Sequence, residues 1–291
     1  MTAPRGAVIA YSLKKKLDGE ITMEILDPSG AVVRTLTSKK EPSEFEEDDP
    51  DAPGRPREKA VLTTEPGVQR VTWDLRYEAA TKIKKAKTEG DPEAAPRAVP
   101  GTYTVRLTVE GKILTTPLEV RPDPRLPVPL PEIDEQVKFA QTVQAQVTRL
   151  STLVAQIRSV RDQVKLRSEA LGADTRAADW SKAAQDLVTK CDALEEKLHQ
   201  PKAQVEYDIL AKGARLYARL SPLLTYVVDG SGAPTKGMRE VFNDQVRELD
   251  GLESEWKGIV SGDLAALGRR GRELNLQDVI VPEAAATGTG R

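Results

Sequence analysis

Two different hydrophobic periods divide the chain. In the first 122 residues apolar side chains alternate with polar ones, as in Ile21–Ile25, Val71–Leu75 and Tyr103–Val109. Alternation places every second side chain on one face, which is typical of half-buried antiparallel strands. Beyond residue 131 apolar residues recur every three or four positions, which is typical of helices that pack as a left-handed bundle. The pattern predicts a multi-domain α+β protein.

Turn residues separate six or seven short strands in the first part, with Ile9, Tyr11 and Leu13 on the first strand. Asp27-Pro28-Ser29-Gly30 has the composition of a tight turn, so the strand before it should pair with the strand after it. Glu110-Gly111 is a second turn signal, placed before Ile113–Val120. This number of short strands is typical of an antiparallel β-sandwich, which we expect over residues 1–122.

Two long insertions interrupt the strands. Residues 38–59 and 79–100 are rich in charge and proline, with few apolar side chains to offset the entropy of ordering them. We therefore expect both to be exposed loops. Five prolines in Arg121–Pro131 predict an extended linker, assigned to residues 123–131, because proline fits neither a helix interior nor a central strand.

The remaining residues predict an α-helical bundle of about four helices over residues 132–282. The first helix should be the longest, and a third should span Tyr207–Val228 with a kink at Pro222, which lacks a backbone donor. Thr235 should cap a fourth helix. Residues 283–291 end in Ala-Thr-Gly-Thr-Gly-Arg and predict a disordered tail.

Composition limits the classes of function. The chain has 43 Lys and Arg against 45 Asp and Glu, a net charge of -2, which argues against a nucleic-acid binder. No apolar run approaches the roughly 20 residues of a membrane span. The first residues lack the apolar core of a secretory signal, so the chain is either cytoplasmic or a piece of a longer protein.

Candidate catalytic and metal chemistry is sparse. Cys191 and His199 are single residues of their kinds, which excludes an internal disulfide and clusters of several thiolates or imidazoles. Cys191 lies on an apolar helical stripe, as a buried inert thiol does, and His199 ends a helix, where a cation complements the dipole. The acidic run Glu44–Asp51 could gather calcium, although its spacing matches no defined loop. We therefore expect no catalytic, cofactor-binding or metal residues.

Aromatic residues leave one alternative open. Trp73 and Tyr77 lie on alternating strand positions together with Tyr11 and Tyr103, which favours a core role. They could instead form a platform for a sugar ring, so Trp73 and Tyr77 are the two candidate ligand contacts. The lysines of 14–16 and 82–87 have no interleaved aromatics on which bases could stack.

Three segments resemble a known module. Glu24–Leu36, Gly67–Glu78 and Pro100–Val105 contain the order I-x-D-x-x-G-x-x-V-R-x-L, W-D-L-R and P-G-x-Y. This order resembles the immunoglobulin-like module named after the flagellar hook-capping protein. It is similar, more narrowly, to the C-terminal region of large bacterial sortilin-like proteins with BNR-repeat β-propellers, often labelled glycosyl hydrolases. Val120–Arg125 and the helices, including Ile157–Arg161, also look similar to that region.

The resemblance implies an immunoglobulin-like sandwich and a non-catalytic accessory, structural or interaction module of a larger exported propeller protein. The family's propeller, with its Asp-box repeats, is absent from this sequence, so no active site carries over. The implied partner is a protein, such as the propeller or an assembly partner, and no cofactor is implied. The alternatives are part of a carbohydrate-active glycoside hydrolase, or its glycan-binding module.

Overall fold

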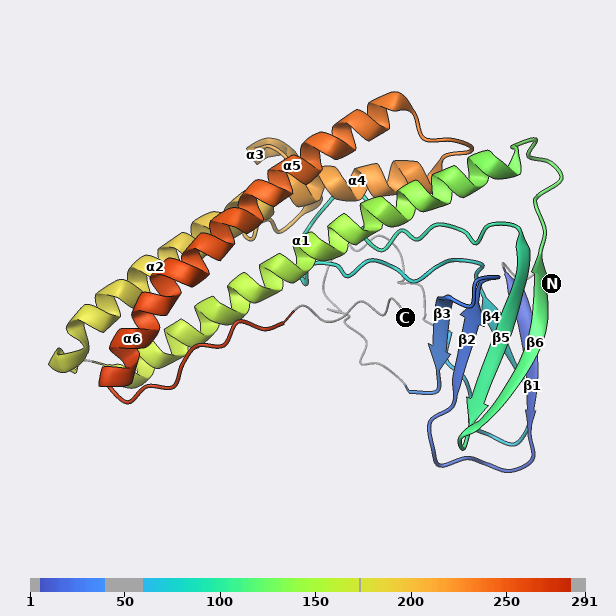
Figure 1. Cartoon of the computed structure of the whole chain (residues 1–291), viewed down its shortest axis with the longest axis horizontal. Coiled ribbons are helices and arrows are strands. Elements are labelled where there is room, and N and C mark those ends of the chain that lie inside the picture. Colours follow the sequence, from blue (N-terminus) through green and yellow to red (C-terminus); the bar gives the residue numbers. More distant parts are fainter. Residues whose placement is uncertain (1–5, 40–59, 173, 284–291) are drawn as a thin grey trace.

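A computed structural model describes residues 6–39, 60–172 and 174–283. Antiparallel sheets form the N-terminal part and helices form the C-terminal part, as Figure 1 shows. The predicted combination of strands followed by helices is confirmed at this level. The acidic run Glu44–Asp51 and residues 284–291 lie outside the described residues.

Six strands are present in the described ranges, and each overlaps a predicted one. Strands β1 and β4 form a two-stranded sheet. The second sheet has the strand order β3-β2-β5-β6, and every neighbouring pair is antiparallel. The bounds are β1 (Ala7–Leu13), β2 (Thr22–Leu26), β3 (Val32–Thr37), β4 (Gly67–Trp73), β5 (Gly101–Val109) and β6 (Lys112–Val120).

Turn chemistry and register fix the four-stranded sheet. The carboxylate of Asp27 accepts hydrogen bonds from the backbone N–H groups of Ser29 (2.8 Å) and Ala31 (3.0 Å), which closes the predicted turn between β2 and β3. Met23 of β2 lies opposite Leu36 and Leu107, and all three side chains are buried. The apolar positions of neighbouring strands therefore share one face.

Both sheets contribute to one core. Its side chains alternate along the strands with exposed ones, as the sequence pattern predicts. The buried cluster comprises Ile9, Tyr11, Leu13, Leu17, Ile21, Met23, Ile25, Val33, Leu36, Leu62, Val71, Trp73, Ala98, Tyr103, Val105, Leu107 and Val120.

The C-terminal region is an elongated bundle (Figure 1). Within the described residues it contains five helices, because α5 continues through a π-helical turn, η2, into α6. The bounds are α1 (Leu130–Leu171), the short 3₁₀ helix η1 (Thr175–Ala177), α2 (Ala178–Leu198), α3 (Glu206–Lys212), α4 (Leu216–Asp229), α5 (Lys236–Ile259), η2 (Val260–Leu264) and α6 (Ala265–Glu273).

Helix boundaries match the predictions in part. Helix α1 is the longest, with 42 residues, and it begins at Leu130, so Pro131 lies in its first turn, where no backbone donor is needed. The Thr235 hydroxyl accepts a hydrogen bond from the Met238 N–H and caps α5 as predicted. No helix in the described ranges has both the length and the apolar content needed to cross a membrane.

The predicted third helix is wrong in one respect. Tyr207–Val228 is not continuous, because the chain breaks between α3 and α4 at Gly213, whose φ of 80° lies outside the helical region. Pro222 lies inside α4.

Residues 79–100 contain no helix or named strand, as predicted for a loop, but the prediction that this loop is exposed is wrong in part. The segment that we call the strap, residues 76–98, leaves the sheets after β4 and runs to the helices before β5 begins (Figure 1). Ala80, Ile83 and Ala94 are buried and belong to the core of the bundle. These few apolar side chains are sufficient to order the strap, because polar groups of the helices form hydrogen bonds with the strap backbone between the buried positions.

Hydrogen bonds attach the strap to two helices. On α1, the Gln144 amide donates to the Glu78 carbonyl (2.5 Å), and the Thr148 hydroxyl accepts from the Thr81 N–H (3.1 Å). On α4, hydroxyl oxygens accept from two further strap N–H groups, those of Ile83 (Tyr217, 3.3 Å) and Asp91 (Thr225, 2.9 Å). The strap therefore joins the sheets to the middle of the bundle independently of the proline-rich linker.

Candidate functional site

The two candidate ligand contacts lie beside each other at the sheet core. Trp73 is 1% exposed, its indole N–H donates to the Arg76 carbonyl (2.9 Å), and its ring meets Tyr103 edge-on at 5.6 Å. Tyr77 is half-buried, and the Tyr103 hydroxyl donates to the Val99 carbonyl (2.8 Å); burial raises the pKa of both tyrosines. Trp73 therefore presents no ring face on which a sugar could stack.

Cys191 has the environment predicted for an inert thiol. Its side chain is fully buried in α2, and burial raises its pKa to about 11. Thiolate is the nucleophilic form, so this thiol is poorly reactive at neutral pH. The described residues contain no group of three or more His, Cys, Asp and Glu side chains able to hold a metal ion.

A polar cluster in the bundle surrounds the single histidine. His199 caps the C-terminal end of α2, as predicted, but its ring is only 2% exposed and faces Glu195, which is 1% exposed. Two arginines of α1, Arg158 and Arg161, lie against this pair. We call Arg158, Arg161, Glu195 and His199 the charge network.

Helical spacing brings these residues together. Arg158 and Arg161 are three residues apart on α1, and Glu195 and His199 are four apart on α2, so each pair occupies one helical face. The facing stripes of α1 and α2, including Ile157 on α1, hold the two helices in contact.

Both carboxylate oxygens of Glu195 are paired with arginine. Arg158 Nε donates to Oε1 (2.6 Å), and Arg161 Nη1 donates to Oε2 (2.5 Å). Arg161 Nη1 also donates to Asp192 (3.0 Å) at the edge of the network. His199 Nε2 lies 3.0 Å from Oε1 of Glu195 and 3.2 Å from Nη2 of Arg158.

The electrostatics favour a fully ionised carboxylate. Burial alone raises the pKa of Glu195, but hydrogen bonds from His199 and Arg158 and the charges of both arginines outweigh it and lower the pKa to about 2. A general base requires a pKa near the working pH. The network is thus an ion cluster that joins α1 and α2.

A third segment joins the charge network. Arg158 Nη1 donates to the Lys84 carbonyl of the strap (3.0 Å). Arg158, a residue of α1, thus contacts α2 through Glu195 and the strap through the Lys84 carbonyl. Sequence reasoning did not identify this network; the Glu195/His199 spacing opposite R-x-x-R on a long neighbouring helix is the signal that could have done so.

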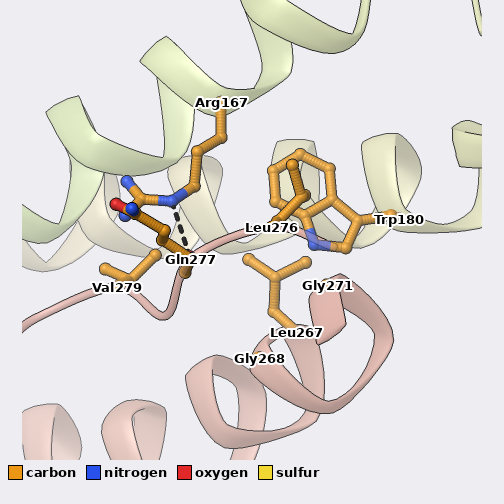
Figure 2. A pocket seen from close by; sticks show the side chains of 8 residues that line it. All are labelled: Arg167, Trp180, Leu267, Gly268, Gly271, Leu276, Gln277 and Val279. Carbon is orange, nitrogen blue, oxygen red and sulfur yellow. Dashed lines mark hydrogen bonds between the residues drawn. The ribbon is translucent and has the colours of Figure 1, made fainter. Parts of the chain in front are cut away.

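A small hollow lies at the far end of the bundle, shown in Figure 2. The Arg167 guanidinium spans it and donates to the carbonyls of Gln277 and Asp278, both at 2.9 Å. These bonds fasten residues 277–278 to α1, so the main polar group of the hollow is already used. Its walls are Arg167, Trp180, Leu267, Gly268, Gly271, Leu276, Gln277 and Val279.

Comparisons with protein-family models, with characterised proteins and with solved structures found no match to this chain.

Proposed function

We propose that this chain is a non-catalytic accessory module that holds an immunoglobulin-like sandwich in a set orientation on a helical arm. The larger protein it serves is an exported propeller protein of the sortilin-like, BNR-repeat kind. The strand motifs of Glu24–Leu36 and Gly67–Glu78 support the family assignment through their resemblance.

The observation that carries the proposal is the strap. A single proline-rich connection would leave two domains free to reorient about its ends. The strap adds a second connection, with Ile83 in the bundle core and Arg158 of the charge network bonded to its backbone. The two parts then behave as one rigid body, a property useful for an assembly element.

The charge network supports the same conclusion. Glu195 and His199 are buried, the partly exposed Arg158 and Arg161 pair with both oxygens of the Glu195 carboxylate, and its pKa is held at about 2. Such a cluster fixes the orientation of two helices and the strap. The glycan-binding alternative needs an exposed aromatic platform, and Trp73 is in the core.

Spin-label distances test the rigid-arm proposal. Labels at Thr104→Cys on β5 and Ser254→Cys on α5, both exposed positions, should give one narrow distance distribution in the whole protein. Replacing Cys191 by Ser in the same background removes the native thiol. Ile83→Asp should broaden the distribution while the sheets stay folded. A broad distribution before the strap is altered would overturn the proposal.

Catalysis is tested separately with aryl-glycoside, ester and peptide substrates. The accessory-module proposal requires turnover at background, with and without added calcium or zinc. Turnover that survives repurification and disappears on changing one Asp or Glu would favour the glycoside hydrolase alternative.

A further inference from the structure

Strand β6 forms an open edge of the four-stranded sheet. Every residue of 112–117 is exposed, and the neighbours Ile113 and Leu114 are 62% and 63% exposed. Leu114 lies opposite the buried Leu107 and so points to the core side, which the two-stranded sheet leaves uncovered there. The edge therefore carries an uncovered large apolar side chain on each face.

The hairpin register shows which backbone groups face outward. Glu110 and Gly111 form a two-residue turn, so Val109 and Lys112 are a hydrogen-bonded pair. Counting on by twos, Leu114 and Thr116 also bond to β5. The backbone N–H and C=O groups then point away from the sheet at the alternate positions 113, 115 and 117. A proline at 117 agrees with this register, because proline has no N–H to donate to β5.

The opposite edge is covered. On β3, the Val33 carbonyl accepts from the Glu78 N–H (3.1 Å), and the Thr35 N–H donates to the Glu78 carboxylate (2.7 Å). Along β6, by contrast, the described residues provide no such cover. An edge of this kind is a template for another strand.

We propose that the β6 edge pairs with the β6 edge of a second copy of this chain, antiparallel about a two-fold axis at Leu114. In this register Ile113 of one copy lies opposite Thr115 of the other, so the outward groups of these residues bond across the interface. Leu114 meets its own counterpart, which covers its exposed side chain. This inference does not depend on the proposed function.

The charges and the short length of residues 112–117 are both compatible with pairing to a second copy. Lys112 is the one charged residue in 112–117, and it lies opposite Thr116 of the other copy, so like charges do not meet. Pro117 lies opposite Gly111 and has no N–H to offer, which ends the pairing and prevents sliding. An edge of this length buries less accessible surface than the roughly 1,200 Å² of a stable interface. We therefore expect the dimer to be weak.

Cysteine cross-linking tests the register directly. Two Leu114→Cys chains bring their Cα atoms to about 4.5 Å in a non-hydrogen-bonded pair, within reach of a disulfide. Ile113→Cys is the matched control: it is equally exposed, but its nearest opposite residue is Thr115, so its own counterpart is out of reach. Under mild oxidation we expect a dimer from Leu114→Cys only.

Sedimentation over about 1 μM to about 1 mM gives an independent readout. The sedimentation coefficient should rise with concentration in the unaltered protein and stay flat in Thr115→Pro, which removes an outward donor but no bond to β5. Val68→Lys, on an exposed position of β4, should behave as the unaltered protein does. A monomer throughout, equal cross-linking of both cysteine variants, or association unaffected by Thr115→Pro would overturn the proposal.

Discussion

Glu195 shows how a single residue can escape a periodic pattern. The apolar stripe of α2 passes through Leu194 and Leu198, and Glu195 lies beside it, where a solvated side chain is the usual outcome. In the structure two arginines from α1 cover Glu195 and make its burial possible. The sequence predicts the stripe, but the partner from a distant helix is a tertiary feature that the periodicity of α2 does not contain.

Replacing Glu195 by Gln should therefore destabilise the protein. The change leaves Arg158 and Arg161 without their buried counter-charge, and breaking such a pair typically costs about 3–5 kcal/mol. Glu196→Gln is the matched control, because Glu196 is exposed and its contact with Lys202 is a surface ion pair. Chemical denaturation should show a clear loss for Glu195→Gln alone; equal stability of both variants would contradict the structural role of the network.

The same carboxylate should make stability depend on acid pH. Its pKa is lowered from 4.5 to about 2 in the folded protein, so its contribution is complete above pH 4.5 and is lost as pH falls toward 2. Between these values the unaltered protein should lose about 1.4 kcal/mol per pH unit more than Glu195→Gln does. Parallel denaturation curves for both proteins from pH 6 to about 2.5 measure this difference; identical slopes would show that Glu195 is not held ionised.

At the scale of elements, local chemistry predicts more than tertiary contact does. The turn at Asp27, the Thr235 cap and the alternation along β5 each depend on residues close in sequence, and all three are found in the structure. The strap is different. Its charged composition suggests exposure, and only the side chains of α1 and α4, more than 60 residues away, make its ordered path favourable.

Gly90→Ala tests the contact between the strap and α4. A methyl group on Gly90 would lie 2.3 Å from the Pro222 nitrogen and 2.5 Å from its Cα, too close for any real contact. Overpacking of this kind costs about 1–3 kcal/mol, and the affected atoms belong to the backbone, which cannot move aside. We expect a lower melting temperature and faster hydrogen exchange in the strap.

Gly251→Ala is the control for that substitution. Gly251 lies inside α5 with nothing within 4 Å of an added methyl group, so alanine should stabilise the helix by about 0.5–1 kcal/mol. Opposite signs for the two glycine variants are the expected result. An unchanged melting temperature for Gly90→Ala would mean that the strap does not rest on α4 in solution.

At the scale of the whole molecule, the change of hydrophobic period marks where strands end and helices begin, since periodicity follows from secondary structure alone. It does not reveal how independent the two parts are. The linker Arg121–Pro131 suggests separable domains, whereas the strap places Ile83 and Ala94, from the sheet half of the chain, in the bundle core. The linker thus predicts that the two parts fold as independent fragments, whereas the strap predicts that the helical part is less stable without the sheet part.

Dividing the chain at residue 122 decides between them. We expect fragment 1–122 to keep its sheet core, because the buried side chains of that cluster all lie within it. Fragment 123–291 should remain helical but melt at a lower temperature than the helices of the whole chain. It lacks Ile83, and removing a buried aliphatic side chain typically costs about 2–5 kcal/mol.

Adding fragment 1–122 in equimolar amount should restore part of the lost stability, as measured by thermal melts with circular dichroism at 222 nm. If fragment 123–291 melts as the whole chain does, with no response to its counterpart, the strap does not stabilise the bundle and the two parts are independent domains.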